Sequence, residues 1–326
     1  MSLLMGGATM TDSDSGQVVL VIGGTGFLGR RVVSALTGAG HRVRSLVREP
    51  ARAAGLFDDR VEIAQGDMLD ADAVAGAVRQ ARAVIVCVHT LSAQPARKAG
   101  HDFVDVEVAG VGNIVAACRA NGVDRLLYVT SIGVAADASS SWTRGRARIE
   151  SLLFASGLDV TVLRPGMIVG HGGSGFGMVE RGARSRAAVL LSSRHQRFRT
   201  VAVDDLAHQL VVLLDEPRSF GRHFDVGSDD VLTIDEMMDL AAEHLGRRRP
   251  TKIHLPRRAI ACIAPLVERA AKMPPGAISG FVGAGSDSDM IGDATAIRAL
   301  LDQPPRTFGE AMAQALREGS AAAASS

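Results

Sequence analysis

The first half of the chain alternates short apolar runs with longer amphipathic segments. The runs at 18–22, 83–88 and 125–129 are almost entirely apolar. Such runs are typical of strands in a parallel sheet that is covered by helices on both faces. Between them, apolar residues recur three or four positions apart, which predicts helices with one buried face. The predicted strands are 18–22, 42–47, 61–65, 83–88, 125–129 and 159–163, and the predicted helices are 27–37, 51–56, 70–80, 102–121 and 139–156.

This alternation of strand and helix predicts an α/β fold, a Rossmann-type doubly wound parallel sheet with right-handed crossovers. After Gly166 the pattern is less regular. We therefore expect a Rossmann domain over 17–165 and a smaller C-terminal α/β substrate lobe over 166–318, partly interleaved with it. Residues 1–16 and 319–326 are expected to be disordered tails. In the lobe, strands are predicted at 198–203, 222–226 and 251–255, and helices at 204–214, 233–245, 257–271 and 307–317.

Local signals in the lobe predict a loop and two helix starts. Residues 170–177 contain five glycines and are expected to form a mobile loop. Asp204 or Asp205 is predicted to cap the helix that ends near 214. Thr233 and Glu236 have the spacing of a capping box.

Composition and charge narrow the classes of partner. The 326 residues include 36 lysines and arginines and 35 aspartates and glutamates, a net charge of +1, which argues against nucleic acid or an anionic membrane as the main partner. Cys87, Cys118 and Cys262 are far apart, so neither a disulfide framework nor a metal site is predicted. The sequence has no signal-peptide pattern and no apolar run long enough to span a membrane, so a cytoplasmic protein is expected.

The motif GGTGFLG at 23–29 follows a predicted strand and opens a predicted helix. Gly23 allows a sharp turn, Gly26 lets a pyrophosphate approach the backbone, and Gly29 lets the helix lie close to the sheet. The amides at 25–28 would meet the pyrophosphate at the positive end of the helix dipole. A turn without a ligand has the same spacing, but the next strand completes a dinucleotide-binding context. The expected contacts are Gly23, Thr25, Gly26, Phe27, Leu28, Gly29 and Arg30.

Further motifs follow in order: LVREP at 46–50, GDMLD at 66–70, YVTSIGV at 128–134, IESLLFASGLDVTVLRPGMIVG at 149–170 and VAVDDLAHQL at 201–210. Together they resemble the atypical and extended short-chain dehydrogenase/reductase families, including NmrA-like proteins, quinone-reductase-like proteins and the NADPH-binding accessory subunit of respiratory complex I. The resemblance implies a nicotinamide cofactor across the carboxyl ends of the strands. It also implies cofactor contacts at Asp67, Met68, Val88, His89, Pro165 and Ile168.

The second strand indicates which cofactor is used. NAD selectivity usually needs an acidic residue at its end, whereas here Arg44 and Arg48 flank that end and Arg30 begins the first helix. An arginine can form two parallel charge-assisted hydrogen bonds with a phosphate. The resemblance implies that the arginines at 30 and 48 bind the 2′-phosphate, so NADP(H) is favoured over NAD(H). The alternative is that Arg48 is a solvated turn residue.

The chain lacks the Tyr-x-x-x-Lys pair that normally moves the proton and holds the nicotinamide ribose in short-chain dehydrogenases. The resemblance puts this pair at Trp142 and Arg146, while the accompanying serine is kept as Ser131. An indole N–H is no acid near neutral pH, and an arginine stays charged. We expect Arg146 to hold the ribose and Trp142 to stack on a flat substrate. The alternative is a tryptophan that packs on the helix surface.

Three functions remain open from the sequence. The first is hydride transfer from NADPH to a quinone or another planar, electron-poor acceptor, whose reduced anion solvent can protonate. The second is a non-catalytic NADP(H)-binding redox sensor or assembly protein. The third is a nucleotide-sugar epimerase or reductase in which His89 or His171 supplies the proton. In each enzyme hypothesis the partner is a small-molecule substrate, and a monomer or homodimer is expected.

The segment 257–271 is apolar in its middle and basic at one end. We expect it to be a core helix of the substrate lobe. The alternative is an amphipathic helix that lies on a membrane surface.

Overall fold

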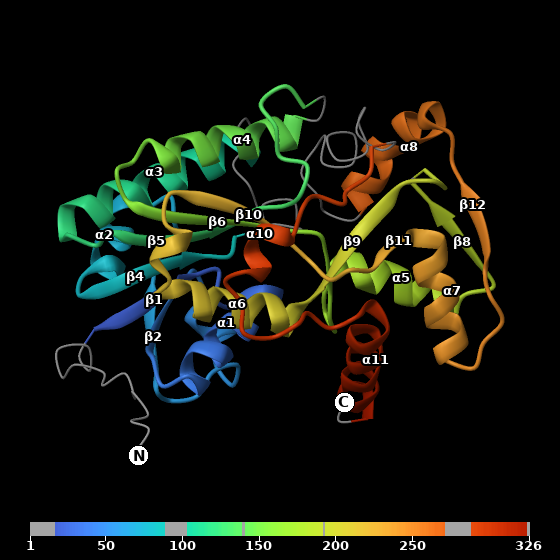
Figure 1. Ribbon diagram of the computed structural model, residues 1–326, viewed down its shortest axis with the longest axis horizontal. Helices are drawn as coiled ribbons and strands as arrows, with labels where there is room; N and C mark the ends of the chain where they lie inside the picture. The colour runs from blue at the N-terminus through green and yellow to red at the C-terminus, as the bar shows by residue number, and fades with distance from the viewer. Residues whose placement is uncertain (1–16, 89–102, 139–140, 192, 271–287, 325–326) are drawn as a thin grey trace, which may run out of the picture.

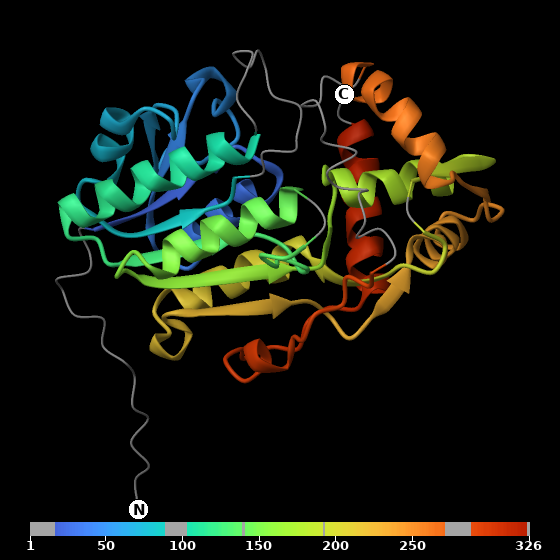
Figure 2. The same cartoon turned by 90° about the horizontal axis from the view of Figure 1, so that it is seen from above.

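The computed structural model describes residues 17–88, 103–138, 141–191, 193–270 and 288–324. Figures 1 and 2 show a larger lobe built on a twisted sheet and a smaller lobe beside it. The larger lobe contains a seven-stranded sheet in which every pairing is parallel. Its strands, in spatial order, are β3 (Val61–Gln65), β2 (Arg42–Val47), β1 (Val18–Ile22), β4 (Ala81–Val86), β5 (Arg125–Val129), β6 (Asp159–Pro165) and β10 (Arg222–Val226).

This strand order is that of a doubly wound dinucleotide-binding fold with one more strand at the β6 edge. All five residues of β1 are buried, because this strand lies between β2 and β4 in the middle of the sheet. The fold class predicted from the sequence is confirmed. The added strand, β10, shows that the chain leaves the sheet after β6 and later returns to it.

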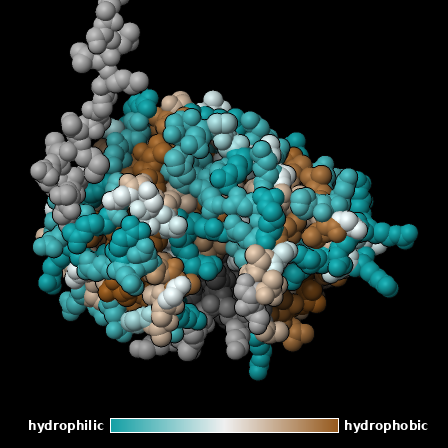
Figure 3. Space-filling model, turned by 90° about the horizontal axis from the view of Figure 1, so that it is seen from below, coloured by the Kyte–Doolittle hydropathy of each residue, from teal (hydrophilic) through white to brown (hydrophobic). Residues whose placement is uncertain are grey.

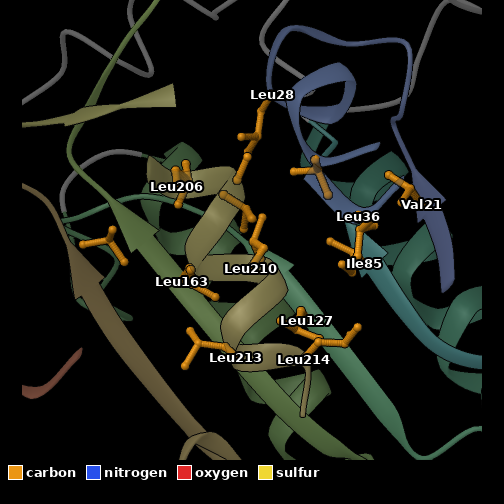
Figure 4. Packing of buried hydrophobic residues seen from close by; sticks show 14 of the residues in the cluster. Val21, Leu28, Leu36, Ile85, Leu127, Leu163, Leu206, Leu210, Leu213 and Leu214 are labelled. Atoms are coloured by element: carbon orange, nitrogen blue, oxygen red, sulfur yellow. The ribbon is translucent and has the colours of Figure 1, made fainter. Parts of the chain in front are cut away.

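Helices cover both faces of the sheet. On one face, α1 (Phe27–Gly38) and α6 (Val203–Leu214) enclose a layer that includes Leu36, Leu127 and Leu210 (Figure 4). On the other face lie α2 (Ala71–Val78), α3 (Phe103–Asn121) and α4 (Ser141–Phe154). Because both faces are covered, the central strands are apolar on both sides, which accounts for the continuous apolar runs of the sequence.

The smaller lobe contains two small sheets and most of the chain after β6. β9 (Arg197–Ala202) pairs in parallel with β7 (Met167–Val169) and antiparallel with β11 (Val231–Thr233). β8 (Ala187–Leu190) pairs with β12 (Thr251–His254). The helices of this part are α5 (Ser174–Arg184), α7 (Ile234–His244), α8 (Arg257–Ala270) and α11 (Phe308–Ala324), and the short elements of the chain are η1 (Pro50–Arg52), η2 (Pro217–Ser219) and α10 (Thr295–Arg298).

Two expectations for this lobe were wrong. The glycine-rich segment 170–177 is not a loop throughout, because α5 begins at Ser174 and buries Phe176 and Val179 in the core of the lobe. Only 170–173 remain a turn. The last helix does not end at 317 but continues to Ala324, so most of the expected tail at 319–326 is helical. The expected tail at 1–16 lies outside the described residues.

The start of α6 also differs from the prediction. Ala202 is the N-cap, and no side chain caps the helix. Asp204 and Asp205 lie in the first turn instead, where they pair with Arg31 and Arg306. The capping box of Thr233 and Glu236, by contrast, is present as predicted.

Candidate functional site

In the turn between β1 and α1, a Cβ would collide with backbone atoms at two glycines. Gly23 has a φ of +88°, and a Cβ there would lie 2.9 Å from the carbonyl oxygen of Cys87. A Cβ on Gly29 would lie 2.0 Å from the carbonyl oxygen of Gly23. The backbone therefore turns sharply at the end of β1, and α1 packs directly on the turn.

The amino-terminal end of α1 is suited to an anion. The N-cap is Gly26, which is exposed, and neither a capping side chain nor an acidic residue occupies the first turn. The first amides of a helix, here those of Phe27 and Leu28, have no partner within it, and the helix dipole favours negative charge there. Thr25 is half-buried, and Arg30 is exposed at the same end. A pyrophosphate fits this arrangement.

A glycine turn from the smaller lobe lies against the same helix end. A Cβ on Gly173 would lie 2.7 Å from the ring of Phe27. Gly172 has a φ of +87°, and a Cβ there would lie 3.6 Å from the guanidinium of Arg30. The turn at 170–173 therefore covers part of the first turn of α1, so both lobes contribute to this end of the site.

The two arginines that flank the end of β2 have different environments. The Nη1 atom of Arg44 donates to the carbonyl oxygens of Ala77 at 2.7 Å and Arg79 at 2.6 Å, and its Nε lies 2.8 Å from the Glu62 carboxylate. Arg44 therefore joins β2 to the end of α2. Arg48 follows the carboxyl end of β2 with an exposed side chain, so it is accessible to a phosphate.

Four of the residues predicted to contact the cofactor come after β3 and β4. The Asp67 carboxylate accepts a hydrogen bond from the amide of Leu69 at 2.9 Å, which shapes the turn into α2. Met68 is 9% exposed, and its side chain fills the space beside Gly110 of α3. Val88 is half-buried next to the β1 turn. His89 lies outside the described residues.

The loop after β5 lies beside the end of β6. The amide of Ile132 donates to the carbonyl oxygen of Pro165 at 3.0 Å. The hydroxyl oxygens of Thr130 and Ser131 are buried, yet neither has a hydrogen-bond partner within the described residues. Buried hydroxyls are normally paired, so these two point to a polar ligand at the ends of β5 and β6. Ile168 is half-buried on β7, just beyond Pro165.

Trp142 and Arg146 belong to a buried polar cluster. The Nη1 atom of Arg146 donates to the Tyr128 hydroxyl at 2.7 Å and lies 2.9 Å from the Glu107 carboxylate. The Tyr128 hydroxyl donates to Glu107 at 2.6 Å. The centre of the Arg146 guanidinium lies 5.3 Å from the centroid of the Trp142 ring. Each of the four side chains is 5% exposed or less, so Trp142 is not a helix-surface residue and Arg146 pairs inside the protein.

Glu107 was not identified from the sequence, although a signal for it exists. Val104, Glu107, Val111 and Ile114 are all buried and recur at helical spacing along α3. A glutamate within such an apolar stripe requires a buried cation or hydrogen-bond donors, because an unpaired buried carboxylate is costly. The chain's sole tyrosine and Arg146 provide both.

The buried environment makes the Tyr128 phenol a weaker acid than usual. Burial raises the pKa of Tyr128 well above its ordinary value, and this effect outweighs the nearby charge of Arg146, which lowers the pKa. The phenol therefore stays protonated and is not a ready proton donor. Burial likewise raises the pKa of the Cys87 thiol beside the glycine turn to about 12, so this cysteine is not a nucleophile.

The fold and this site define a dinucleotide-binding α/β protein. The family model described as NAD(P)H-binding matches residues 23–217, and the chain belongs to this family. It is 30% identical to a ceramide reductase of Caulobacter vibrioides over 257 residues, 78% of this chain and 79% of that protein. The family membership supports a nicotinamide cofactor.

One further relative agrees with the resemblance predicted from the sequence, and a solved structure has the same fold. The chain is 23% identical to subunit 9 of the NADH dehydrogenase [ubiquinone] 1 alpha subcomplex of Dictyostelium discoideum, over 74% of this chain and 67% of that protein. A UDP-glucose 4-epimerase of Thermotoga maritima has the same fold, with a TM-score of 0.73 at 16% identity over 94% of this chain and 99% of that one.

The described residues contain neither a membrane-spanning helix nor a metal-binding cluster. No helix among them combines the length and apolar character needed to cross a membrane. No three His, Cys, Asp or Glu side chains among them gather where they could hold a metal ion.

Proposed function

We propose that this protein is an NADPH-dependent reductase that delivers hydride to a planar, electron-poor acceptor of the quinone type. The buried cluster of Glu107, Tyr128, Trp142 and Arg146 carries this proposal, because it leaves no acid at positions 142 and 146. Reduction of a ketone produces a basic alkoxide and needs such an acid nearby. Reduction of a quinone produces a stabilised anion that water can protonate.

In this proposal NADPH supplies the hydride, and the residues of the chain orient the two reactants. The amides of Phe27 and Leu28 bind the pyrophosphate, and Arg30 and Arg48 bind the 2′-phosphate. The hydroxyls of Thr130 and Ser131 donate hydrogen bonds to an oxygen of the acceptor. Arg146 fixes α4 against α3 and β5 through Glu107, in place of the ribose contact expected from the sequence.

The names of two relatives support reductase chemistry. One is a ceramide reductase, and the other is a subunit of a ubiquinone-linked NADH dehydrogenase. These names concern those proteins, and the acceptor of this chain is inferred from its own site.

The test is the rate of NADPH oxidation with menadione, compared with cyclohexanone and with a reaction that lacks the protein. We expect oxidation with the quinone and none with the ketone. The Gly29→Ala variant, which should not bind the cofactor, controls for contaminating reductases. A menadione rate no higher than that without protein, at saturating NADPH, would rule out the proposal.

A second candidate is a non-catalytic NADP(H)-binding redox sensor or assembly protein, and the same absence of an acid favours it. The two candidates differ in turnover. A protein that keeps NADP(H) through purification but oxidises it with none of a panel of quinones fits the second function.

The epimerase alternative has less support. Its proton would have to come from His89, which lies outside the described residues, or from His171. The ring of His171 lies against α11, where a Cβ on Gly319 would be 3.0 Å from its Nδ1 atom. If His171→Gln changes no measured rate, His171 is not a proton donor.

A further inference from the structure

Residues 288–291, which are distant in sequence from the candidate site, lie along β9. The amide of Met290 donates to the carbonyl oxygen of Arg197 at 2.7 Å, and the amide of Arg199 donates to the carbonyl oxygen of Met290 at 2.9 Å. The Nε atom of Arg199 donates to the carbonyl oxygen of Ile291 at 2.7 Å. These hydrogen bonds fix the backbone of Met290 against β9.

The position on β9 brings Met290 near the end of β6. β11 occupies one edge of β9, so β7 and the segment 288–291 share the other edge. Phe198 of β9 is bridged to Met290. Two residues further along β9, Thr200 pairs with Met167, the first residue of β7. Met167 comes only two residues after Pro165, a predicted cofactor contact at the end of β6.

The side chain of Met290 reaches the loop after β5. Its sulfur and Cε atoms lie 3.0 and 3.2 Å from where a Cβ on Gly133 would be. Gly133 is exposed, has a φ of +87° and comes two residues after Ser131. Met290 itself is half-buried. The thioether therefore packs on the loop that carries the hydroxyls of Thr130 and Ser131, which have no partner among the described residues.

We propose that Met290 forms a wall of the acceptor site and selects acceptors by the size of their ring system. The proposal rests on the proposed function for the position of the acceptor, whose oxygen accepts from the hydroxyls of Thr130 and Ser131. A small ring bound there contacts the Met290 thioether, and methionine sulfur packs favourably on aromatic rings. A broader ring system collides with this side chain, which cannot withdraw as a whole because its backbone is fixed on β9.

A flat acceptor needs an apolar contact beside its hydrogen-bond donors. Ligand sites for such molecules combine apolar walls with a few placed polar groups. Figure 3 shows a face of the molecule that is largely hydrophilic, with its hydrophobic residues in separate patches. The loop after β5 has both features, because Met290 packs beside two buried hydroxyls. The alternative role for Met290 is packing alone, which would affect acceptors of every size alike.

The test compares duroquinone, which has one ring, with 9,10-phenanthrenequinone, which has three, in steady-state NADPH oxidation by the full-length protein. Met290→Ala should lower the KM for phenanthrenequinone relative to that for duroquinone by about tenfold, an effect typical of enlarging an apolar pocket. Met290→Leu has a similar side-chain volume, so it should keep the KM ratio of the wild type.

The matched control is Met178→Ala on α5, where another methionine is 36% exposed. This variant should keep the KM ratio of the wild type. If the wild type reduces both quinones and Met290→Ala does not change the ratio, the proposal is overturned and the proposed function stands. Equal losses of activity with both quinones, together with a lower unfolding temperature, would assign Met290 to packing alone and also overturn it.

A second measurement does not require turnover. Hydrogen peroxide should oxidise Met290 in the NADP⁺-loaded protein, and menadione should protect it, as measured by mass spectrometry of peptides. Oxidation of Met178 should be the same with and without menadione. If the wild type oxidises NADPH with no quinone but menadione still protects Met290, only the proposed function fails. Equal oxidation of Met290 with and without menadione would overturn its place in the acceptor site.

Discussion

At the scale of single residues, two glycines of α1 differ in their surroundings. A Cβ on Gly29 would collide with the backbone of the β1 turn, whereas a Cβ on Gly38, at the other end of the helix, would meet nothing within 4 Å. Gly29→Ala therefore tests the close approach of the helix to the turn. Gly38→Ala changes only the conformational entropy of the unfolded backbone.

We expect Gly29→Ala to lower the free energy of unfolding by about 1–3 kcal/mol, because the added methyl must displace the turn. It should also abolish NADPH binding, since the same turn faces the pyrophosphate. Gly38→Ala should raise stability by up to about 1 kcal/mol. Denaturant unfolding and NADPH fluorescence titration measure these effects, and normal NADPH binding by Gly29→Ala would contradict the assigned site.

Cofactor choice can be tested at Arg48. Arg48→Ala should weaken NADPH binding by about tenfold or more, the loss expected for a charge-assisted hydrogen bond, and leave NADH binding unchanged. The matched control is Arg42→Ala. Arg42 is also exposed, but it lies at the amino-terminal end of β2, away from the predicted cofactor site. If Arg48→Ala affects both cofactors equally, the preference for NADP is wrong.

At the scale of elements, the cluster of Glu107, Tyr128 and Arg146 joins α3, β5 and α4 through charged groups rather than apolar contacts. Arg146→Met should lower stability by about 3–5 kcal/mol, because it leaves the buried Glu107 without its cation. The double variant Glu107→Leu with Arg146→Met should recover much of this loss, since no unpaired charge remains. Urea unfolding of the single and double variants measures the difference in their free energies of unfolding. If the two variants are equally stable, the pairing of Glu107 with Arg146 is contradicted.

The same cluster predicts a dependence on alkaline pH. Burial raises the pKa of Tyr128, so the folded protein keeps a proton that the unfolded chain loses above about pH 10. The stability that this group contributes is present below that pH and is lost as the pH rises through the folded pKa. Because Tyr128 is the sole tyrosine, phenolate absorbance should appear only together with unfolding. Ionisation near pH 10 in the folded state would contradict its burial.

The success of sequence prediction also varies between elements. The predicted bounds of β1, β2, β3 and β5 match the structure, and those of β1 and β5 follow directly from apolar runs, because helices cover both faces of the sheet there. α5 was missed since its glycines suggest a loop, yet Phe176 and Val179 bury enough surface to stabilise the helix. The glycine turn of the candidate site could be predicted from its local sequence. The partners of Arg146 could not, because they come from two other elements, α3 and β5.

At the scale of the whole molecule, ion pairs connect the last helix to the first. Arg31 of α1 hydrogen-bonds with Glu318 of α11 and lies 3.5 Å from Asp204 of α6. Gln314 of α11 donates to the same Asp204 carboxylate at 2.7 Å. These side chains are about one-third exposed or less, so solvent screens them only in part. They hold α11 against the helix that carries the candidate pyrophosphate site.

We expect Arg31→Met to lower the free energy of unfolding by about 1 kcal/mol at low salt and by less at high salt. The control is Arg218→Met, because Arg218 is 64% exposed and pairs only with nearby Glu216 among the interactions described. That variant should be neutral. Chemical denaturation at two salt concentrations provides the comparison, and an Arg31 effect that does not depend on salt would exclude an electrostatic origin.

The return of β10 to the sheet affects how this protein can be divided. A fragment cut after Pro165 would retain the nucleotide-binding turn but lose the strand that pairs with β6. The freed backbone groups of β6 would then be open to pairing with other chains, which is a route to aggregation. The first 165 residues are therefore not an independent folding unit, and a chimera made with a relative would have to exchange β10 together with the rest of the chain after β6.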